Sequence, residues 1–217
     1  MPKDDIRIEA NGCLDELNAV IGIVRSMLAA KDAWQELLHA VQRELIAALH
    51  HAGKKVVLVN CSGSPIGLEP ETGRCGAILQ AWYPGQAGGT AVAEVLFGDY
   101  NPAGRLPVTF YRNVSQLPDF EDYNMTGRTY RYMTQEPLFP FGHGLSYTSF
   151  CYGAVVLGSD NIKSGEKLRL NVPVTNTGKC DGEEVVQVYL KKNDDVEGPS
   201  KALRAFKRVH IPAGKTV

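Results

Sequence analysis

The sequence predicts an α/β fold followed by an all-β region, with a pair of helices in front. Three successive residue patterns along the 217-residue chain support this order. Apolar residues recur at helical spacing in residues 1–52. Short continuous apolar runs bounded by turn residues mark residues 53–150, and alternating apolar and polar residues mark residues 151–217. We therefore expect an N-terminal helical segment, a partial α/β domain and a truncated β-sandwich over these three ranges.

Two amphipathic helices account for the N-terminal segment. The first carries its apolar residues between Leu14 and Leu28. Asp32 followed three residues later by Gln35 resembles a capping box for the second helix. Gly53 is a typical residue for ending that helix, because glycine adopts the left-handed backbone of a helix C-terminus without a steric cost.

The α/β layering rests on two apolar runs and a helix. Val56–Val59 is typical of a strand buried on both faces. A second run, Ala77–Tyr83, ends at a Pro-Gly pair, and Thr90–Leu96 has the pattern of a helix. Strand, connection, strand and helix in this order predict parallel strands. Residues 98–150 form a long stretch rich in Gly, Pro and aromatic residues, whose rings are too many to leave in water.

Three segments predict the strands of the β region: Leu168–Val174, Val185–Leu190 and Ala205–Ile211. Lys215–Val217 resembles the start of a further strand. A sandwich of this kind has about seven strands, so we expect a truncated one. Missing strands expose a sheet edge and an apolar face, which favours aggregation and broad melting.

Composition excludes several classes of function. The chain is 44% hydrophobic and 22% charged, with a formal net charge of -1, as in ordinary globular proteins. It lacks the basic excess that attracts nucleic acid or an anionic membrane. The polar N-terminus has no signal-peptide core behind it, so the sequence does not indicate the cellular compartment. The five cysteines and five histidines form no ligand pattern, so we expect no metal and no cofactor.

Several motifs in a fixed order resemble glycoside hydrolase family 3, in its β-xylosidase and β-glucosidase branch, over about residues 41–217. The segments that carry this resemblance are Gly85–Ala91, Val95–Thr109, Gly127–Tyr132, Pro140–Tyr147, Val174–Gly178, Gly182–Leu190 and Leu203–Phe206. The first four are similar to the domain that follows the family's catalytic barrel, and the last three to its fibronectin-type-III-like tail. The resemblance implies part of an exo-acting enzyme that hydrolyses O-glycosyl bonds in β-linked oligosaccharides. It also implies the barrel as a missing partner, and a parent protein of a kind often periplasmic or secreted.

The same resemblance implies that the catalytic residues are absent. Retaining glycosidases need two carboxyl groups about 5 Å apart. In the family the nucleophilic Asp lies on the barrel, which alone needs about 250 residues. The acid/base Glu lies upstream of a segment that survives here only as Val41–Ile46. We therefore expect the isolated chain to be inactive. Two groups of loop carboxylates are interpreted as solvated: Glu69 and Glu71, and Asp119, Glu121 and Asp122.

Five residues are candidates for lining the substrate cleft. Trp82 and Tyr83 end a predicted strand, where ligand sites of α/β proteins gather, although the residue types favour packing in the core. Arg128 and Arg131 flank Tyr130 and have the chemistry to bind a sugar hydroxyl or carboxylate. Bracing of the aromatic loop is the alternative for both arginines. A carbohydrate-binding or scaffold module without catalysis therefore remains a further functional hypothesis.

Residues 3–44 resemble a different family, the corrinoid adenosyltransferases, which transfer an adenosyl group from ATP to cobalamin. The similarity is carried by Lys3–Ala10, Gly12 and Asp15–Ala19. It implies a helical bundle, with matching nucleotide- and corrinoid-region positions at Arg7, Glu9 and Asn18. The family's Gly-rich ATP loop and the later half of its bundle are absent. These features predict a chimera of two families, joined near Val41–Leu45; two amphipathic helices with a chance likeness are the alternative.

Overall fold

The computed structural model describes residues 33–217, and side chains from residue 37 onward. It divides into two compact units. Of the described residues, the first unit contains 33–60 together with Leu68–Gln80, and the second contains Cys61–Gly67 and Ala81–Val217. The first of the two predicted helices, and the positions Arg7, Glu9 and Asn18, lie outside the described residues.

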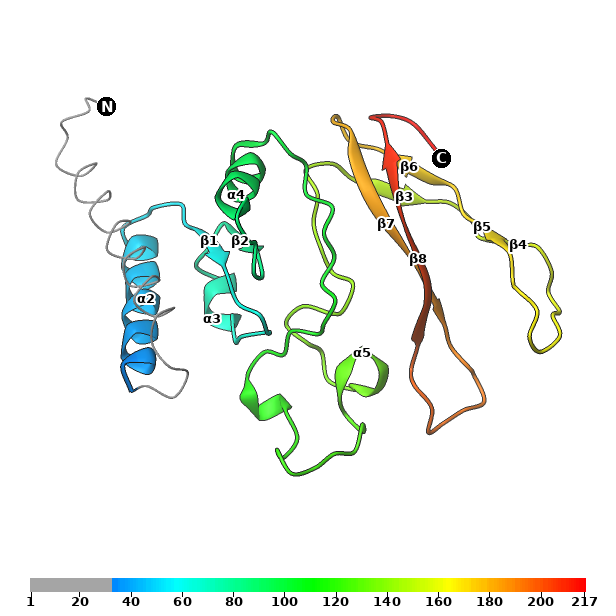
Figure 1. Ribbon diagram of the computed structural model, residues 1–217, viewed down its shortest axis with the longest axis horizontal. Helices are drawn as coiled ribbons and strands as arrows, with labels where there is room; N and C mark the ends of the chain where they lie inside the picture. The colour runs from blue at the N-terminus through cyan, green and yellow to red at the C-terminus, as the bar shows by residue number, and fades with distance from the viewer. Residues whose placement is uncertain (1–32) are drawn as a thin grey trace. The chain divides into compact units, whose positions relative to one another are not determined.

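Helix α2, Ala33–His51, is the long helix of the first unit (Figure 1). Its C-terminus is closed by Gly53, whose φ of 69° is left-handed. The amides of Gly53 and Lys54 bond back to the carbonyls of His50 and Leu49 at 2.9 and 3.0 Å. This pair of bonds is a Schellman motif, which satisfies carbonyls that the helix leaves free. The stop predicted at Gly53 is confirmed.

Strands β1, Val57–Asn60, and β2, Ala77–Gln80, run parallel as predicted, with the short helix α3, Glu69–Thr72, between them in sequence. Burial on both faces, however, is a wrong prediction, because Val57 is 49% exposed. The described part of this sheet has only two strands, so its surface is half covered. Apolar runs identify a strand, but the number of its neighbours sets its burial.

The first helix of the second unit is α4, Gly88–Phe97, which confirms the predicted helix and ends at the left-handed Gly98. The segment after it is loop-rich, as expected, with two short elements. These are the 3₁₀ helix η1, Val114–Gln116, and helix α5, Thr129–Tyr132. Phe110, only 1% exposed, forms a β-bridge with Phe139 and anchors the segment.

The expectation that the aromatic residues of this segment are buried together holds only in part. Phe110 is at the centre of the core, but the side chains of Phe120 and Tyr123 are 92% and 87% exposed. Both lie on the loop between η1 and α5. Aromatic content predicted a core, and the arrangement of the loop decides which rings enter it.

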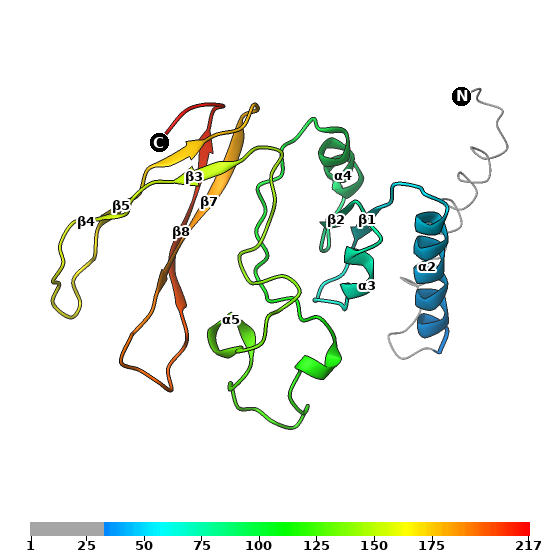
Figure 2. The same ribbon diagram turned by 180° about the vertical axis from the view of Figure 1, so that it is seen from behind.

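The β region consists of small antiparallel pairs. The strands are β3 (Phe150–Tyr152) with β6 (Val174–Asn176), β4 (Val156–Leu157) with β5 (Leu170–Asn171), and β7 (Gly182–Leu190) with β8 (Ala202–Ile211). Figures 1 and 2 show β7 and β8 as the longest of them. The pair β7–β8 has an irregularity between Val188 and Tyr189.

Two details correct or extend the predicted strands. The single strand expected over Leu168–Val174 is split, because Pro173 has no N–H to donate to a ladder. The last residues of the sequence pair with β6, since Val174 and Val217 exchange two hydrogen bonds of 2.9 and 3.0 Å. The predicted strand start at Lys215–Val217 is therefore confirmed. The core of this region contains Val174 and Ile211, at 1% and 0% exposure.

Candidate functional site

Trp82 and Tyr83 follow β2 directly in the chain and differ in their surroundings. Trp82 has a left-handed backbone, with φ at 55°, which is costly for a residue with a large side chain. Its ring meets Phe110 edge-on at 6.2 Å between centroids. Tyr83 is 81% exposed, and its ring lies over Gly63, where any β-carbon would collide with it. The structure thus packs Trp82 against the core and presents Tyr83 to solvent.

Arg128 is bound to the backbone of the loop that precedes it. Its Nε donates to the Asn124 carbonyl at 2.8 Å, and its Nη2 donates to the carbonyls of Asp122 and Asp119. Three carbonyls held by one guanidinium fix the course of residues 119–124. The loop is further tightened at Asp122, whose pKa is lowered because its carboxylate accepts hydrogen bonds from Asn124.

Tyr130 and Arg131 lie on α5 and contact the β7–β8 hairpin. The Tyr130 ring stacks on Phe141 with centroids 4.3 Å apart, and its hydroxyl accepts from the Leu203 amide at 3.1 Å. The Arg131 carbonyl accepts from the Ser200 amide at 2.7 Å. Among the described residues, no hydrogen bond or ion pair holds the Arg131 guanidinium. Tyr130 is therefore built into the packing, and Arg131 keeps a free cationic head.

Two consecutive residues, Phe110 and Tyr111, contact the two segments that carry the cleft candidates. Phe110 contacts Trp82, and the hydroxyl of the next residue, Tyr111, accepts from the Thr129 amide at 3.0 Å. Thr129 is the first residue of α5 and, like Trp82, has a φ of 55°. Non-glycine residues in this conformation cluster at functional sites, and both of these flank candidate residues.

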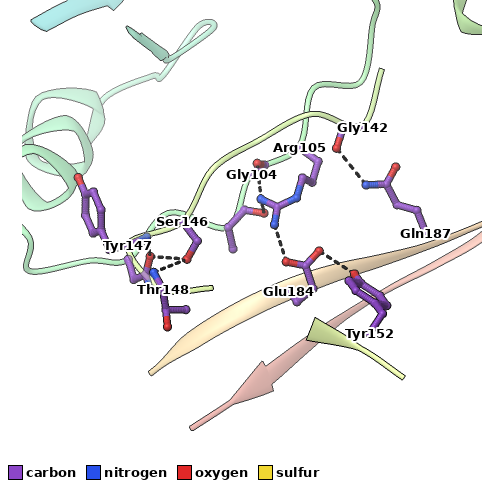
Figure 3. Close-up of polar contacts among 11 residues, drawn as sticks. Gly104, Arg105, Gly142, Ser146, Tyr147, Thr148, Tyr152, Glu184 and Gln187 are labelled. Atoms are coloured by element: carbon purple, nitrogen blue, oxygen red, sulfur yellow. Dashed lines mark hydrogen bonds and ion pairs between the residues drawn. The ribbon is translucent and has the colours of Figure 1, made fainter. Parts of the chain in front are cut away.

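A buried ion pair, which the sequence pattern did not single out, lies between Arg105 and Glu184 in the second unit (Figure 3). Arg105 Nη2 is 2.6 Å from Glu184 Oε2, and the two side chains are only 11% and 9% exposed. The Tyr152 hydroxyl donates to Glu184 Oε1 at 2.9 Å. Arg105 also donates to the carbonyls of Ala103 and Gly104 at 3.3 and 3.1 Å. Burial, followed by the charge and hydrogen bond of Glu184, raises the pKa of Tyr152 far above its ordinary value.

This centre joins the motif segments of the loop region to the strands. Arg105 comes from the loop after α4, Glu184 from β7 and Tyr152 from β3. Both charged residues belong to motifs that the sequence singles out, but 79 positions separate them. Only the fold shows that they pair.

Gly142 and His143 add further contacts around the Arg105–Glu184 ion pair. The Gly142 carbonyl accepts from Gln187 Nε2 at 3.1 Å, and Gly142 has a left-handed φ of 81° with Gln187 so close that a β-carbon has no room (Figure 3). The Leu106 amide donates to the His143 carbonyl at 2.8 Å. The His143 ring stacks on Phe139 at 5.3 Å. Burial and the nearby Arg105 charge lower the pKa of His143, so the ring is neutral near pH 7.

Two asparagines in the motif segments, Asn101 and Asn176, form hydrogen bonds with the backbone of neighbouring segments. Asn101 Oδ1 accepts from the Ser146 hydroxyl and the Tyr147 amide, each at 2.8 Å, while its Nδ2 donates to the Asp181 carbonyl at 2.9 Å. Asn176 is fully buried, and its Nδ2 donates to the carbonyls of Cys180 and Ile211 at 2.9 Å. The two side chains use both ends of the amide, as a buried polar group requires.

The loop carboxylates do not all lie in solvent. Asp119 and Glu121 are exposed, as expected, but solvation of Glu71 is a wrong prediction: it lies in α3 at 2% exposure, with its carboxylate 3.4 Å from Arg43 Nε. Among the residues with described side chains, the buried carboxylates are Glu71 and Glu184, and each faces an arginine.

Other chemistry is limited within the described part of the chain. Over residues 33–217 there is no group of three or more His, Cys, Asp or Glu residues placed to hold a metal ion. None of the helices in that range is long and apolar enough to span a bilayer. The four cysteines there, Cys61, Cys75, Cys151 and Cys180, are free thiols.

Comparison with known proteins identifies the segments that carry the motifs. The family model described as glycosyl hydrolase family 3 C-terminal domain matches residues 18–147, and a fibronectin type III-like domain model matches residues 184–217. A xylan 1,4-beta-xylosidase from Xylanibacter ruminicola is 58% identical over 179 residues, covering 82% of this chain and 20% of the relative. A periplasmic beta-glucosidase from Salmonella typhimurium is 38% identical over 225 residues, covering 97% and 29%.

Solved structures agree. A β-glucosidase from Erythrobacter marinus has a TM-score of 0.71 at 44% identity, covering 81% of this chain and 24% of that one. Beta-glucosidase 3B from Thermotoga neapolitana, in complex with glucose, has a TM-score of 0.71 at 34% identity, covering 80% and 26%. The chain thus spans between a fifth and three tenths of the length of these proteins.

The comparisons do not support the predicted chimera. The family match begins at residue 18, inside the segment assigned to an adenosyltransferase, and not at about residue 41. The periplasmic relative aligns with 97% of the chain, which reaches into the same segment. Amphipathic helices share apolar spacing whatever their family, so a short helical likeness has little specificity. The roles suggested for Arg7, Glu9 and Asn18 are withdrawn with it.

Proposed function

Because this chain belongs to glycosyl hydrolase family 3, of which it contains the C-terminal domain, we propose that it is the C-terminal part of an exo-acting β-glycosidase. The parent enzyme is a β-xylosidase or β-glucosidase that hydrolyses O-glycosyl bonds of β-linked oligosaccharides. The observation that carries this proposal is the family match over residues 18–147. The 58% identity to a protein named xylan 1,4-beta-xylosidase favours the xylosidase.

The proposed role of this chain is to support the substrate cleft and not to break the bond. Hydrolysis with retention needs two carboxyl groups about 5 Å apart, one as nucleophile and one as acid/base. The buried carboxylates Glu71 and Glu184 are each engaged with an arginine, which leaves neither for that chemistry. We therefore expect both catalytic groups to come from the remainder of the enzyme, and the isolated chain to be inactive.

Within this proposal the cleft candidates have different tasks. Tyr83 and Arg131 are the candidates that contact substrate. The Tyr83 ring is exposed, and among the described residues no hydrogen bond or ion pair holds the Arg131 guanidinium. An arginine offers several donors to sugar oxygens, and a tyrosine offers a ring face and a hydroxyl. Trp82, Arg128 and Tyr130 position them through the core, the 119–124 loop and the β7–β8 hairpin. The domain division at residues 52 and 150 remains part of the proposal.

The test replaces the corresponding C-terminal segment of the Xylanibacter ruminicola relative with this chain. We expect the fusion to hydrolyse nitrophenyl β-xyloside or β-glucoside, and the isolated chain to show no turnover. In the fusion, Tyr83→Ala should raise KM more than it lowers kcat, whereas Phe97→Ala, an equally exposed ring that ends α4, should change neither. Turnover by the isolated chain, or a folded but inactive fusion, would contradict the proposal.

A carbohydrate-binding module without catalysis is the second candidate. The exposed rings of Phe120 and Tyr123 favour it, because an exposed aromatic ring offers a flat apolar face on which a sugar ring can stack. The two candidates are compatible, since binding by this loop needs no catalytic residue.

A further inference from the structure

A pocket of about 240 Å³ lies in the loop region of the second unit. Most of its walls come from two segments, one around η1 and one after α5. Its polar lining includes Ser115, Thr126, Thr134 and Gln135. None of the residues that line it is charged, so it has no feature to attract a phosphate, a carboxylate or a cation.

Several hydrogen-bonding groups of this pocket are available. Within the described part of the chain, no hydrogen bond engages the hydroxyls of Thr126 and Thr134. Gln135 accepts from Gln116 Nε2 at 3.2 Å through its oxygen, while its own amide nitrogen donates to no described residue. Hydroxyls and a primary amide both donate and accept, which suits a ligand that carries many hydroxyl groups.

Two exposed aromatic rings belong to the loop that connects two residues lining this pocket. Pro118 and Thr126 line the pocket, and the loop between them carries Phe120 and Tyr123 at 92% and 87% exposure. Arg128 holds the backbone of this loop through three carbonyls, so the rings stand on a fixed support. Preorganised aromatic surface beside neutral polar groups lowers the entropy that binding costs.

We propose that this pocket and the loop at its rim, residues 115–135, bind a neutral β-linked oligosaccharide. The rings of Phe120 and Tyr123 stack on the apolar faces of the sugar, and Thr126, Thr134 and Gln135 bond to its hydroxyls. The choice of a β-linked sugar rests on the proposed function; the choice of a neutral polyhydroxylated ligand rests on the lining itself.

The experiment is a titration of the isotope-labelled 217-residue chain with xylotetraose and, separately, cellotetraose, followed by NMR. We expect saturable shifts confined to amides of residues 113–135, with at least one of the two sugars. Phe120→Ala and Tyr123→Ala should each weaken binding about tenfold, the scale of one lost aromatic contact. Phe97→Ala, 83% exposed on α4, is the matched control and should leave the affinity unchanged.

Three outcomes overturn the inference. One is the absence of saturable shifts in residues 113–135 with either sugar, and another is equal weakening by the Phe97 variant. The third is that these amides respond only to the recombinant N-terminal part of the Xylanibacter ruminicola relative, which makes the loop a protein contact. Circular dichroism of each variant shows that it is folded. An active fusion without sugar binding here removes this inference alone, while saturable binding beside an inactive fusion removes only the proposed function.

Discussion

At the scale of single residues, side chains and backbone groups of the family motifs connect the loop region to the β region. Arg105, Asn101 and Gly142 each bond a loop segment to residues of the β region. Two of the partners, Glu184 and Gln187, are buried and half-buried polar side chains, which are costly to leave unpaired. The same side chains need not touch a substrate to be required by the enzyme.

Arg105→Ala should show directly how much stability is lost when a buried charge has no partner. Glu184 would remain as a buried charge without its cation, and removing one partner of such a pair costs about 3 kcal/mol or more. Amide hydrogen exchange in β7 and β8 should accelerate roughly a hundredfold, which is the equivalent change in an opening equilibrium. Lys192→Ala is the control, because the Lys192–Asp194 pair spans 3.9 Å with both side chains exposed. Equal acceleration in the two variants would show that the Arg105 pair is not special.

His143 gives the protein a pH dependence of definite sign. Its pKa in the folded protein lies below the ordinary value near 6.5, so the unfolded chain binds more protons as the pH falls below that value. The stabilisation is complete above about pH 6.5 and is lost as the pH falls through the folded pKa. Protection factors of the Leu106 amide should therefore decrease between pH 7.5 and pH 5.5. His143→Gln should flatten this trend, whereas His210→Gln, on an exposed position of β8, should not; a pH trend that survives His143→Gln would contradict the assignment.

At the scale of elements, α5 depends on what it contacts. A helix of four residues has no stability of its own, because nucleation is unfavourable and few bonds follow it. The contacts of Tyr130 with Phe141, Tyr189 and the Leu203 amide supply what the short helix lacks. The connection between β7 and β8 is held in return, since Ser200 donates to the Arg131 carbonyl. The helix and the hairpin therefore order each other.

Tyr130→Phe isolates one part of that coupling. The ring and its stacking remain, while the Leu203 amide loses its acceptor, a change worth about 1 kcal/mol. Exchange of the Leu203 amide should become roughly fivefold faster. Tyr130→Ala should also lose the stacked ring and loosen the amides of α5. Tyr123→Phe, on an 87% exposed residue, is the matched control, and a similar effect from it would remove the role given to the Tyr130 hydroxyl.

At the scale of the whole molecule, the chain consists of two units with little regular sheet. The described strands form four two-stranded pairs, and pairs of this size bury little apolar surface. Val155, Val156 and Phe206 are 58%, 59% and 70% exposed in the β region. Uncovered apolar side chains on open strand edges favour association with other chains.

Isolated, the chain should melt over a broad temperature range and associate as its concentration rises. The physical reason is that its small sheets lack the shared core that makes unfolding cooperative. Calorimetry and light scattering measure the two properties. The active fusion with the Xylanibacter ruminicola relative is the control and should melt more sharply. A narrow transition with a monomeric scattering profile for the isolated chain would contradict the prediction.

The sequence by itself determined the order of α/β and β regions, the stop at Gly53, helix α4, the parallel pair β1–β2 and the family. These features depend on local spacing, turn chemistry and ordered motifs, which are written in consecutive residues. It also located Trp82, Tyr83, Arg128, Tyr130 and Arg131, without saying which of them are buried, braced or free.

Only the tertiary structure decided how distant residues pair. The Arg105–Glu184–Tyr152 centre joins three segments, and no local pattern relates positions 79 residues apart. The burial of Glu71, the splitting of the strand at Pro173 and the exposure of Phe120 have the same origin. Each depends on which neighbours cover a side chain or accept its hydrogen bonds. The set of neighbours is a property of the fold and not of the residue itself.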